Sequence, residues 1–428
     1  MTEQKIWYVR TKFVILVHVS HSAGLADFRT ALTTPGARGP VLTSLLARMP
    51  IAMVGLSLLL YVQRESGSFA VAGFVSAGAL VGVAMGAVAQ GRIIDRLGPT
   101  RPLLVAAALF VVTVTTVIVA IESGQTGPLV VGLGWLIGLT EPMVGSASRA
   151  LWTHLLPPGP IRHAAFAYEA ISLEVFFILG PALAGVLVAA PWAGTGLVLS
   201  AAGMVTGAVG FALTAAVRAV RPGPRGGGRL LGALATPGMR TVALGALGFG
   251  VVVGFVEVAI PAAATKAGHA PMGGVMLAAW SLTSVIFGIF YASRPWPRRM
   301  GLRLPFLLGM FALFVVPMAA TSSLVWMAVL SLFAGMWITP QSTTHSTVIE
   351  LAAPEGTATE AFGWIVTSVT LGLAGGQSAS GYLVEHVGVW SAFVSAGAAG
   401  LVIAGLVLAR RTTLAEKPAP LPELVAVG

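Results

Sequence analysis

Long apolar runs alternate with short polar breaks along the chain, from about residue 41 to residue 409. Each run holds about 20 residues, the length at which a helix crosses a hydrocarbon core roughly 30 Å thick. The dyad alternation typical of a membrane β-barrel is missing, and a helix satisfies its own backbone groups in lipid. The pattern predicts twelve membrane-spanning helices: 41–62, 69–89, 102–121, 128–148, 164–190, 196–217, 241–264, 272–293, 304–320, 324–346, 361–383 and 389–409.

Composition supports an all-α integral membrane protein. The 428 residues are 56% hydrophobic and only 9% charged, which leaves too few charges to solvate a globular surface of that size. No cleavable signal peptide is expected, because the first apolar stretch, 13–26, is short and contains two histidines. The chain has no cysteine, so neither a disulfide nor a thiolate metal site is expected.

The net charge of +10 is placed in a way that argues against a nucleic-acid partner. If the N-terminus lies inside the cell, all 25 basic residues except Arg48, Arg64 and Lys266 fall on the cytoplasmic side. Because cytoplasmic loops carry an excess of Lys and Arg, both termini are expected in the cytoplasm. We therefore expect a monomeric protein of the bacterial cytoplasmic membrane whose partners are the lipid bilayer and a small-molecule substrate.

The chain divides into two related halves. At an offset of 196 residues, "AFAY" (165–168) matches "AFGW" (361–364), and Gly180 matches Gly376. The Gly-, Pro- and Arg-rich segment between the halves reads as a linker. Internal repeats of this kind are typical of secondary transporters. The predicted organisation is an N-terminal tail (1–37), a six-helix bundle (38–217), a cytoplasmic linker (218–240), a second six-helix bundle (241–409) and a C-terminal tail (410–428).

The polar break after the second helix carries a motif. "GRIIDRLGPTR" (91–101) resembles the G-x-x-x-D-R-x-G-R-R/K signature of the major facilitator superfamily, although Pro99 and Thr100 make its basic end thinner. The resemblance implies a twelve-helix transporter in which these charges hold the cytoplasmic side closed in the outward-facing state. A solvated loop that only follows the positive-inside rule is the alternative. The residues that fill the pattern are Gly91, Asp95, Arg96, Gly98 and Arg101.

The fifth helix carries a second, partial motif. "GPALAG" (180–185) resembles the core of a helix-five motif from antiporter branches of that family, which favours export. The match rests on Gly180, Pro181 and Gly185, whereas Ala167, Phe176 and Ala184 replace expected glycines. The alternative is a face of small residues that packs against another helix.

Ionisable residues at membrane depth are costly, so each is a candidate for the transport site. Arg48 and Glu141 both lie about seven residues from the cytoplasmic ends of their helices, so we expect them in the central cavity as a possible ion pair. The alternative for Arg48 is snorkelling to the cytoplasmic surface. Glu141 stands four residues before Gly145, where many proton-driven exporters carry arginine, so the role of that arginine does not transfer.

Other candidates lie on the fifth, seventh and tenth helices. Glu174 is expected near mid-membrane, where a desolvated carboxyl group can exchange a proton near neutral pH; a packing role is the alternative. Glu169 is interpreted as a gate or interface residue. Glu257 lies toward the extracellular end of the seventh helix, and Gln341 and His345 belong to a polar patch on the tenth, where a local contact is the alternative role for His345.

Three functions are compatible with this sequence. The first is a proton-coupled exporter of a drug or secondary metabolite, the second a nutrient importer or facilitator, and the third a non-transporting membrane sensor. An enzyme is not expected, because the sequence has no metal-ligand cluster, nucleophile motif or nucleotide loop. No cofactor is expected either, and the proton gradient is the predicted source of energy.

Overall fold

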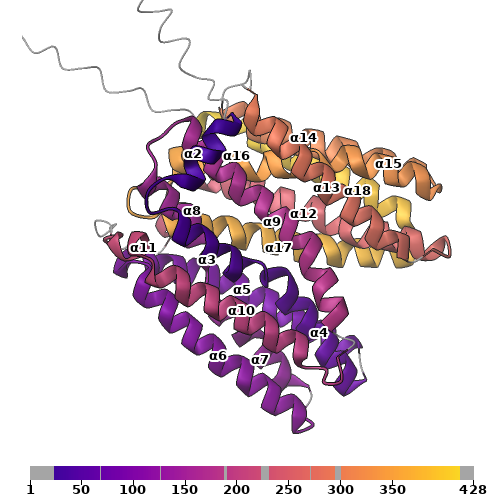
Figure 1. The fold of residues 1–428 in the computed structure, drawn as a ribbon. Coiled ribbons are helices and arrows are strands. Elements are labelled where there is room, and N and C mark those ends of the chain that lie inside the picture. The colour runs from indigo at the N-terminus through magenta and orange to yellow at the C-terminus, as the bar shows by residue number, and fades with distance from the viewer. Residues whose placement is uncertain are drawn as a thin grey trace, which may run out of the picture.

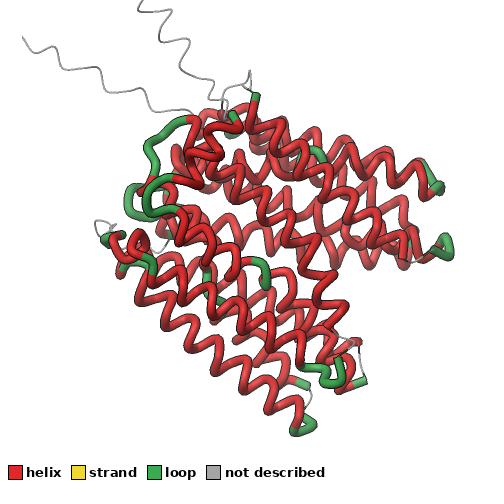
Figure 2. Tube along the Cα trace, viewed as in Figure 1, coloured by secondary structure: helices red, strands yellow, loops and turns green. Residues whose placement is uncertain are grey.

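A computed structural model describes residues 24–67, 69–125, 127–187, 190–222, 231–269, 271–294 and 300–414. The described residues form helices joined by short loops, with no strand among them (Figure 2). The predicted all-α membrane fold is therefore confirmed. Residues 1–23 of the expected N-terminal tail, 223–230 of the linker and 415–428 of the C-terminal tail lie outside the described residues.

Two helical bundles make up the molecule (Figure 1). The short helix α2 (Leu25–Thr33) precedes the first bundle, and α11 (Ala215–Ala219) follows it. The N-terminal half consists of α3 (Arg38–Arg48), α4 (Ile51–Ser66), α5 (Phe69–Leu97), α6 (Thr100–Glu122), α7 (Pro128–Thr140), α8 (Val144–Leu155), α9 (Pro160–Leu187) and α10 (Thr195–Leu213). The linker contains η1 (Gly232–Ala235). The C-terminal half consists of α12 (Pro237–Lys266), α13 (Pro271–Ser293), α14 (Met300–Val315), η2 (Val316–Ala320), α15 (Leu324–Gly335), α16 (Ile338–Ala352), α17 (Ala358–His386) and α18 (Val389–Ala409), and η3 (Arg411–Leu414) follows it.

Within the described residues, 11 helical segments are long and apolar enough to cross a membrane. The long helix α17 is outside this set, since its sequence is rich in Gly, Ser and Thr and includes two glutamates. These small residues pack against α12 and α5, where Gly372 would place a Cβ 2.2 Å from the Leu247 carbonyl oxygen. The low hydropathy of α17 therefore reflects burial between helices.

Three helices that were predicted to be continuous are broken. The first predicted span divides into α3 and α4 at Met49–Pro50, and the fourth into α7 and α8 at residues 141–143. The tenth divides into α15 and α16 at Met336–Trp337. The fourth and tenth spans are equivalent in the internal repeat, because α15 begins 196 residues after α7 (324 against 128). Discontinuous helices at equivalent positions of two repeats mark the binding region of many transporters.

The break between α7 and α8 is held by a side chain of α5. Gln90 Nε2 donates to the carbonyl oxygens of Leu139 at 3.0 Å and Glu141 at 2.8 Å. Its Oε1 accepts a hydrogen bond from the Met143 backbone N–H at 3.1 Å. Backbone groups that lose their helical hydrogen bonds at a break must be satisfied by other protein groups within the membrane. Gln90 satisfies three of these backbone groups.

The two halves meet at one end of the molecule, here called the closed end, and diverge toward the other (Figure 1). At the closed end α5 lies against α17 so closely that a Cβ on Gly91 would be 2.8 Å from the Thr359 carbonyl oxygen. A Cβ on Gly363 would be 2.3 Å from the Ala87 carbonyl oxygen. Toward the opposite end, Gly73 of α5 and Gly381 of α17 have nothing within 4 Å of such a Cβ.

Candidate functional site

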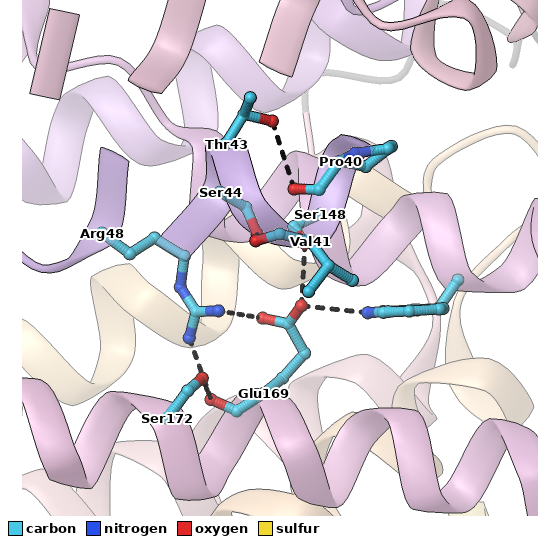
Figure 3. Close-up of polar contacts among 9 residues, drawn as sticks. Pro40, Val41, Thr43, Ser44, Arg48, Ser148, Glu169 and Ser172 are labelled. Carbon is cyan, nitrogen blue, oxygen red and sulfur yellow. Dashed lines mark hydrogen bonds and ion pairs between the residues drawn. The ribbon is translucent and has the colours of Figure 1, made fainter. Parts of the chain in front are cut away.

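A buried ion pair joins α3 to α9 (Figure 3). Arg48 Nη1 lies 2.5 Å from Glu169 Oε2, and Arg48 Nη2 donates to the Glu169 carbonyl oxygen at 2.9 Å. The other carboxylate oxygen, Oε1, accepts hydrogen bonds from Ser148 Oγ at 2.7 Å and Trp152 Nε1 at 2.9 Å, both on α8. The Arg48 and Glu169 side chains are 1% and 0% exposed. This arrangement gives each buried charge an opposite charge and fixed hydrogen bonds, which is what makes burial tolerable.

The structure pairs Arg48 with Glu169 and not with Glu141, so the expected ion pair between Arg48 and Glu141 is wrong. Glu141 occupies the break between α7 and α8 and is 7% exposed, and no basic group of the described residues lies within 4.0 Å of its carboxylate. The snorkelling alternative for Arg48 is wrong as well, because its guanidinium points inward and lies 5.8 Å from the centre of the Phe176 ring. A spacing along two separate helices does not define which of several carboxylates an arginine reaches.

Two glutamates from opposite halves approach each other. Glu174 of α9 lies beside Ser284 of α13 and within electrostatic range of Glu257 of α12. Glu257 Oε2 accepts a hydrogen bond from Gln377 Nε2 of α17 at 3.0 Å. Glu174 thus belongs to the N-terminal half but faces the C-terminal half.

The predicted helix-five motif lies toward the end of α9. Gly180 faces α4, where an added Cβ would be 2.7 Å from the Ala52 Cβ. Pro181 and Gly185 lie in the next turn or two of the same helix. Close packing of Gly180 on α4 is the contact expected of a small-residue face.

The polar patch of the tenth span lies on α16, immediately after the break. Gln341 is 0% exposed, and neither its amide nitrogen nor its amide oxygen has a hydrogen-bond partner in the described part of the chain. His345, one turn later, is 3% exposed. Its ring lies beside the Phe249 ring with the centroids 6.2 Å apart and an interplanar angle of 55°. Buried polar groups without partners are rare, so Gln341 remains a candidate for substrate contact.

The motif of residues 91–101, at the end of α5, forms a clamp between the halves. The Asp95 carboxylate accepts hydrogen bonds from the backbone N–H groups of Thr359 at 3.0 Å and Glu360 at 2.8 Å. These are the second and third residues of α17, so a negative charge sits on the positive end of a long helix. Arg92 Nη2 forms an ion pair with Glu360 Oε1 at 2.8 Å.

The other members of the motif do different work. Arg96 and Arg101 are exposed on the surface. Gly98, with φ of 79°, forms the turn between α5 and α6 and occupies a conformation that favours glycine. Arg92, rather than Arg96, is therefore the arginine of this segment that bridges the halves.

Sequence reasoning missed further residues of the closed end. Arg162 of α9 forms an ion pair with Glu350 of α16, with Nη1 and Oε1 2.6 Å apart. Next to it, His163 Nδ1 and Thr347 Oγ1 are 3.3 Å apart. Arg162 and Glu360 both lie within three residues of the repeated "AFAY" and "AFGW" stretches, which is the signal that would have directed attention to them.

The linker takes part in the same clamp. The Ala233 backbone N–H of η1 donates to Glu360 Oε1 at 3.1 Å. Gly232, with φ of 47°, lies so close to this carboxylate that an added Cβ would be 1.9 Å from Oε1. Glu360 therefore binds Arg92 of the N-terminal half and the end of the linker at once.

These features define a membrane protein of two helical bundles that are joined at one end by a clamp of polar contacts. The family model described as Major Facilitator Superfamily matches residues 41–315. The chain belongs to this superfamily of secondary transporters, and the resemblance seen in the motif of residues 91–101 is confirmed.

Sequence relatives add little detail. An uncharacterized MFS-type transporter, y4rN, of Sinorhizobium fredii is 28% identical over 167 residues, which cover 38% of this chain and 40% of that protein. The alignment thus spans less than half the length of that relative.

Solved structures with the same fold cover nearly the whole chain. The human organic anion transporter MFSD10 has a TM-score of 0.66 at 16% identity and covers 87% of this chain and 99% of its own. A bacterial homologue of the iron transporter ferroportin, in an outward-facing state, has a TM-score of 0.69 at 14% identity, with 88% and 98% covered. At these identities the likeness establishes the fold alone.

Proposed function

We propose that the chain is a proton-coupled exporter that moves a small amphipathic molecule, such as a drug or secondary metabolite, out of a bacterial cell by alternating access. The observation that carries this proposal is the clamp in which Asp95 caps α17 while Arg92 binds Glu360. Such a clamp joins two bundles by contacts that break together when the bundles rock. Two-state motion of this kind is the basis of transport through a fixed central site.

The closed end is assigned to the cytoplasm. Among the described residues, basic side chains are concentrated at this end, whereas Arg64 and Lys266 lie at the opposite end, where they donate to the Ala190 and Val384 carbonyl oxygens. The excess of positive charge favours a cytoplasmic position for the closed end. The conformation is then outward-facing, with both termini inside the cell.

Glu174 is the residue proposed to couple proton and substrate. It faces Ser284 and Glu257 of the other half across the interface that must rearrange during transport. A carboxyl group in this position changes its electrostatic surroundings when the halves rock, so its protonation is linked to the conformational equilibrium.

Transport into proteoliposomes tests the proposal. Vesicles with an acidic lumen are given a panel of fluorescent amphipathic dyes, with protein-free vesicles as the baseline for passive entry. We expect dye to accumulate in exchange for protons, nigericin to abolish accumulation, and Glu174→Gln to lose accumulation while keeping dye exchange at equal pH. Glu65→Gln, which changes an exposed carboxylate at the opposite end, is the matched control.

Other outcomes identify other functions. Dye accumulation that does not depend on the pH gradient, together with full activity of Glu174→Gln, would refute proton coupling. Gradient-independent equilibration of a dye would indicate a facilitator, and the absence of movement of any dye would favour the non-transporting sensor.

A further inference from the structure

An arginine that sequence analysis assigned to a cytoplasmic loop lies inside a membrane-spanning segment. Arg149 belongs to α8, six residues before its end at Leu155, or about 9 Å along the helix axis. No carboxylate of the described residues lies within 4.0 Å of its guanidinium. A charge at this depth without an ion-pair partner among the described residues is expensive and calls for a function.

The surroundings of Arg149 hold more positive than negative charge. Among the described residues, the charged groups that act on Arg149 are Arg48 and Glu169. The Glu169 carboxylate is already engaged, since Arg48 binds one oxygen while Ser148 and Trp152 bind the other. Two guanidinium groups therefore share one carboxylate, and Arg149 carries the excess charge.

Arg149 is also partly exposed. Gly145 and Arg149 are half-buried, whereas the other residues from Glu141 to Leu151 are buried. The two positions are four residues apart and lie on one helix face. Gly145 places this face beside Arg48, because a Cβ on Gly145 would lie 3.9 Å from Arg48 Nε. The accessible stripe of α8 thus runs past the ion pair and presents Arg149 one turn further along.

We propose that Arg149 binds the anionic group of the transported molecule, so that the substrate is a small organic anion carrying a carboxylate, sulfonate or phosphate group. This inference rests on the proposed transport function and specifies its substrate class. Arginine suits the role because its planar fork of N–H groups matches a carboxylate or phosphate with two parallel hydrogen bonds. Arg48 and Glu169 hold the position of α8 through Ser148 and Trp152, and the substrate anion completes the charge balance.

Binding to the purified full-length chain in detergent tests the inference separately from transport. The probes are benzoate, octanoate, benzenesulfonate and phenyl phosphate, each compared with an amine and a neutral amide of the same carbon skeleton. Saturable thermal stabilisation is the readout. We expect at least one anion to stabilise the protein while its amine and amide counterparts do not.

Variants assign the effect to one residue. Arg149→Gln is expected to raise the half-saturating anion concentration at least about tenfold, and Arg149→Lys to have a smaller effect, since it keeps the charge but loses the fork. Arg218→Gln, which removes an exposed arginine of α11, is the matched control and should bind like the wild type. The melting temperature without anion should not fall in Arg149→Gln, because no ion-pair partner among the described residues is left unpaired. Replacement of a purely structural arginine would lower it.

Several results would overturn the inference. They are binding of none of the four anions, equal binding of the amines, or anion binding that Arg149→Gln leaves unchanged. Proton-coupled dye accumulation could persist in each of these cases, so the substrate class can fail while the transport function stands. Conversely, the wild type could bind an anion, lose this binding in Arg149→Gln, and move no dye. That result would uphold the anion site and refute the transport function.

Discussion

Phe166 and Phe362 occupy equivalent positions in the two repeats, 196 residues apart, and contact each other across the closed end. Their ring centroids are 6.1 Å apart with an interplanar angle of 57°. Both side chains are buried, and they belong to one apolar cluster that contains residues of both halves, including Trp152 and Val348. A contact between equivalent residues lies on the pseudo-twofold axis that relates the two halves, and the cluster around it seals the closed end.

Replacing Asp95 by Asn should loosen this seal. The variant removes the charge that two N–H groups of α17 and its dipole stabilise, at a cost of about 1.4 kcal/mol, which is a tenfold change in the closed-to-open ratio. The chain has no cysteine, so Ala361→Cys places a single thiol in the buried seal, where the alanine is 0% exposed. Maleimide labelling of this thiol in membranes should be about tenfold faster with Asp95→Asn.

The control for this prediction is Glu355→Gln, which changes an exposed carboxylate in the loop between α16 and α17. Its labelling rate should equal that of the parent. Equal rates in all three proteins would show that the contact between Asp95 and α17 does not hold the closed end.

Much of the fold follows from hydropathy, whereas the pairing of side chains does not. Apolar runs locate the spans because transfer into lipid depends on composition averaged over about 20 residues. The same averaging hides breaks of two or three residues, so the ends of α7 and α15 were not predicted. It also placed Arg149 in a loop, because the predicted fourth span ends at residue 148, whereas α8 continues to Leu155.

The candidate site shows the same division. Asp95 and Gly91 could be recognised because a motif fixes their spacing, and close approach of α5 to α17 explains that spacing. The partner of Arg48 could not be recognised, because Glu141 and Glu169 both lie on helices of suitable depth. Which of them the guanidinium reaches depends on helix rotation and on the break at Glu141, and neither property is encoded in one short window.

The ion pair between Arg48 and Glu169 should behave as a unit in folding. Arg48→Met leaves a buried carboxylate without its counter-charge and should lower the free energy of unfolding by about 3–5 kcal/mol. Glu169→Leu should cost a similar amount for the opposite reason. Because each single variant strands one charge, the double variant Arg48→Met/Glu169→Leu should lose clearly less than the sum of the two. Unfolding by sodium dodecyl sulfate in mixed micelles measures these differences.

Arg64→Met provides the comparison, since this arginine is exposed and donates to the backbone carbonyl oxygens of Ala190 and Pro191 at the opposite end. Its effect should stay below about 1 kcal/mol. Additive losses in the double variant would mean that Arg48 and Glu169 contribute independently, contrary to the geometry of the pair.

The end of the linker should act as a latch on the closed end. Gly232→Ala puts a methyl group where the Glu360 carboxylate lies, so Glu360 must move away from the Ala233 N–H or from Arg92. A hydrogen bond to a charged group contributes about 1.5–3 kcal/mol, so labelling of the Ala361→Cys thiol should be at least tenfold faster.

Gly268→Ala is the matched control, because Gly268 also has a positive φ, 77°, but has nothing within 4 Å of an added Cβ. Both variants carry the same backbone strain of about 1–2 kcal/mol, so a faster rate in Gly232→Ala alone isolates the contact with Glu360. Equally increased labelling rates in Gly232→Ala and Gly268→Ala would instead attribute the effect to backbone strain. The linker would then have no part in holding the closed end.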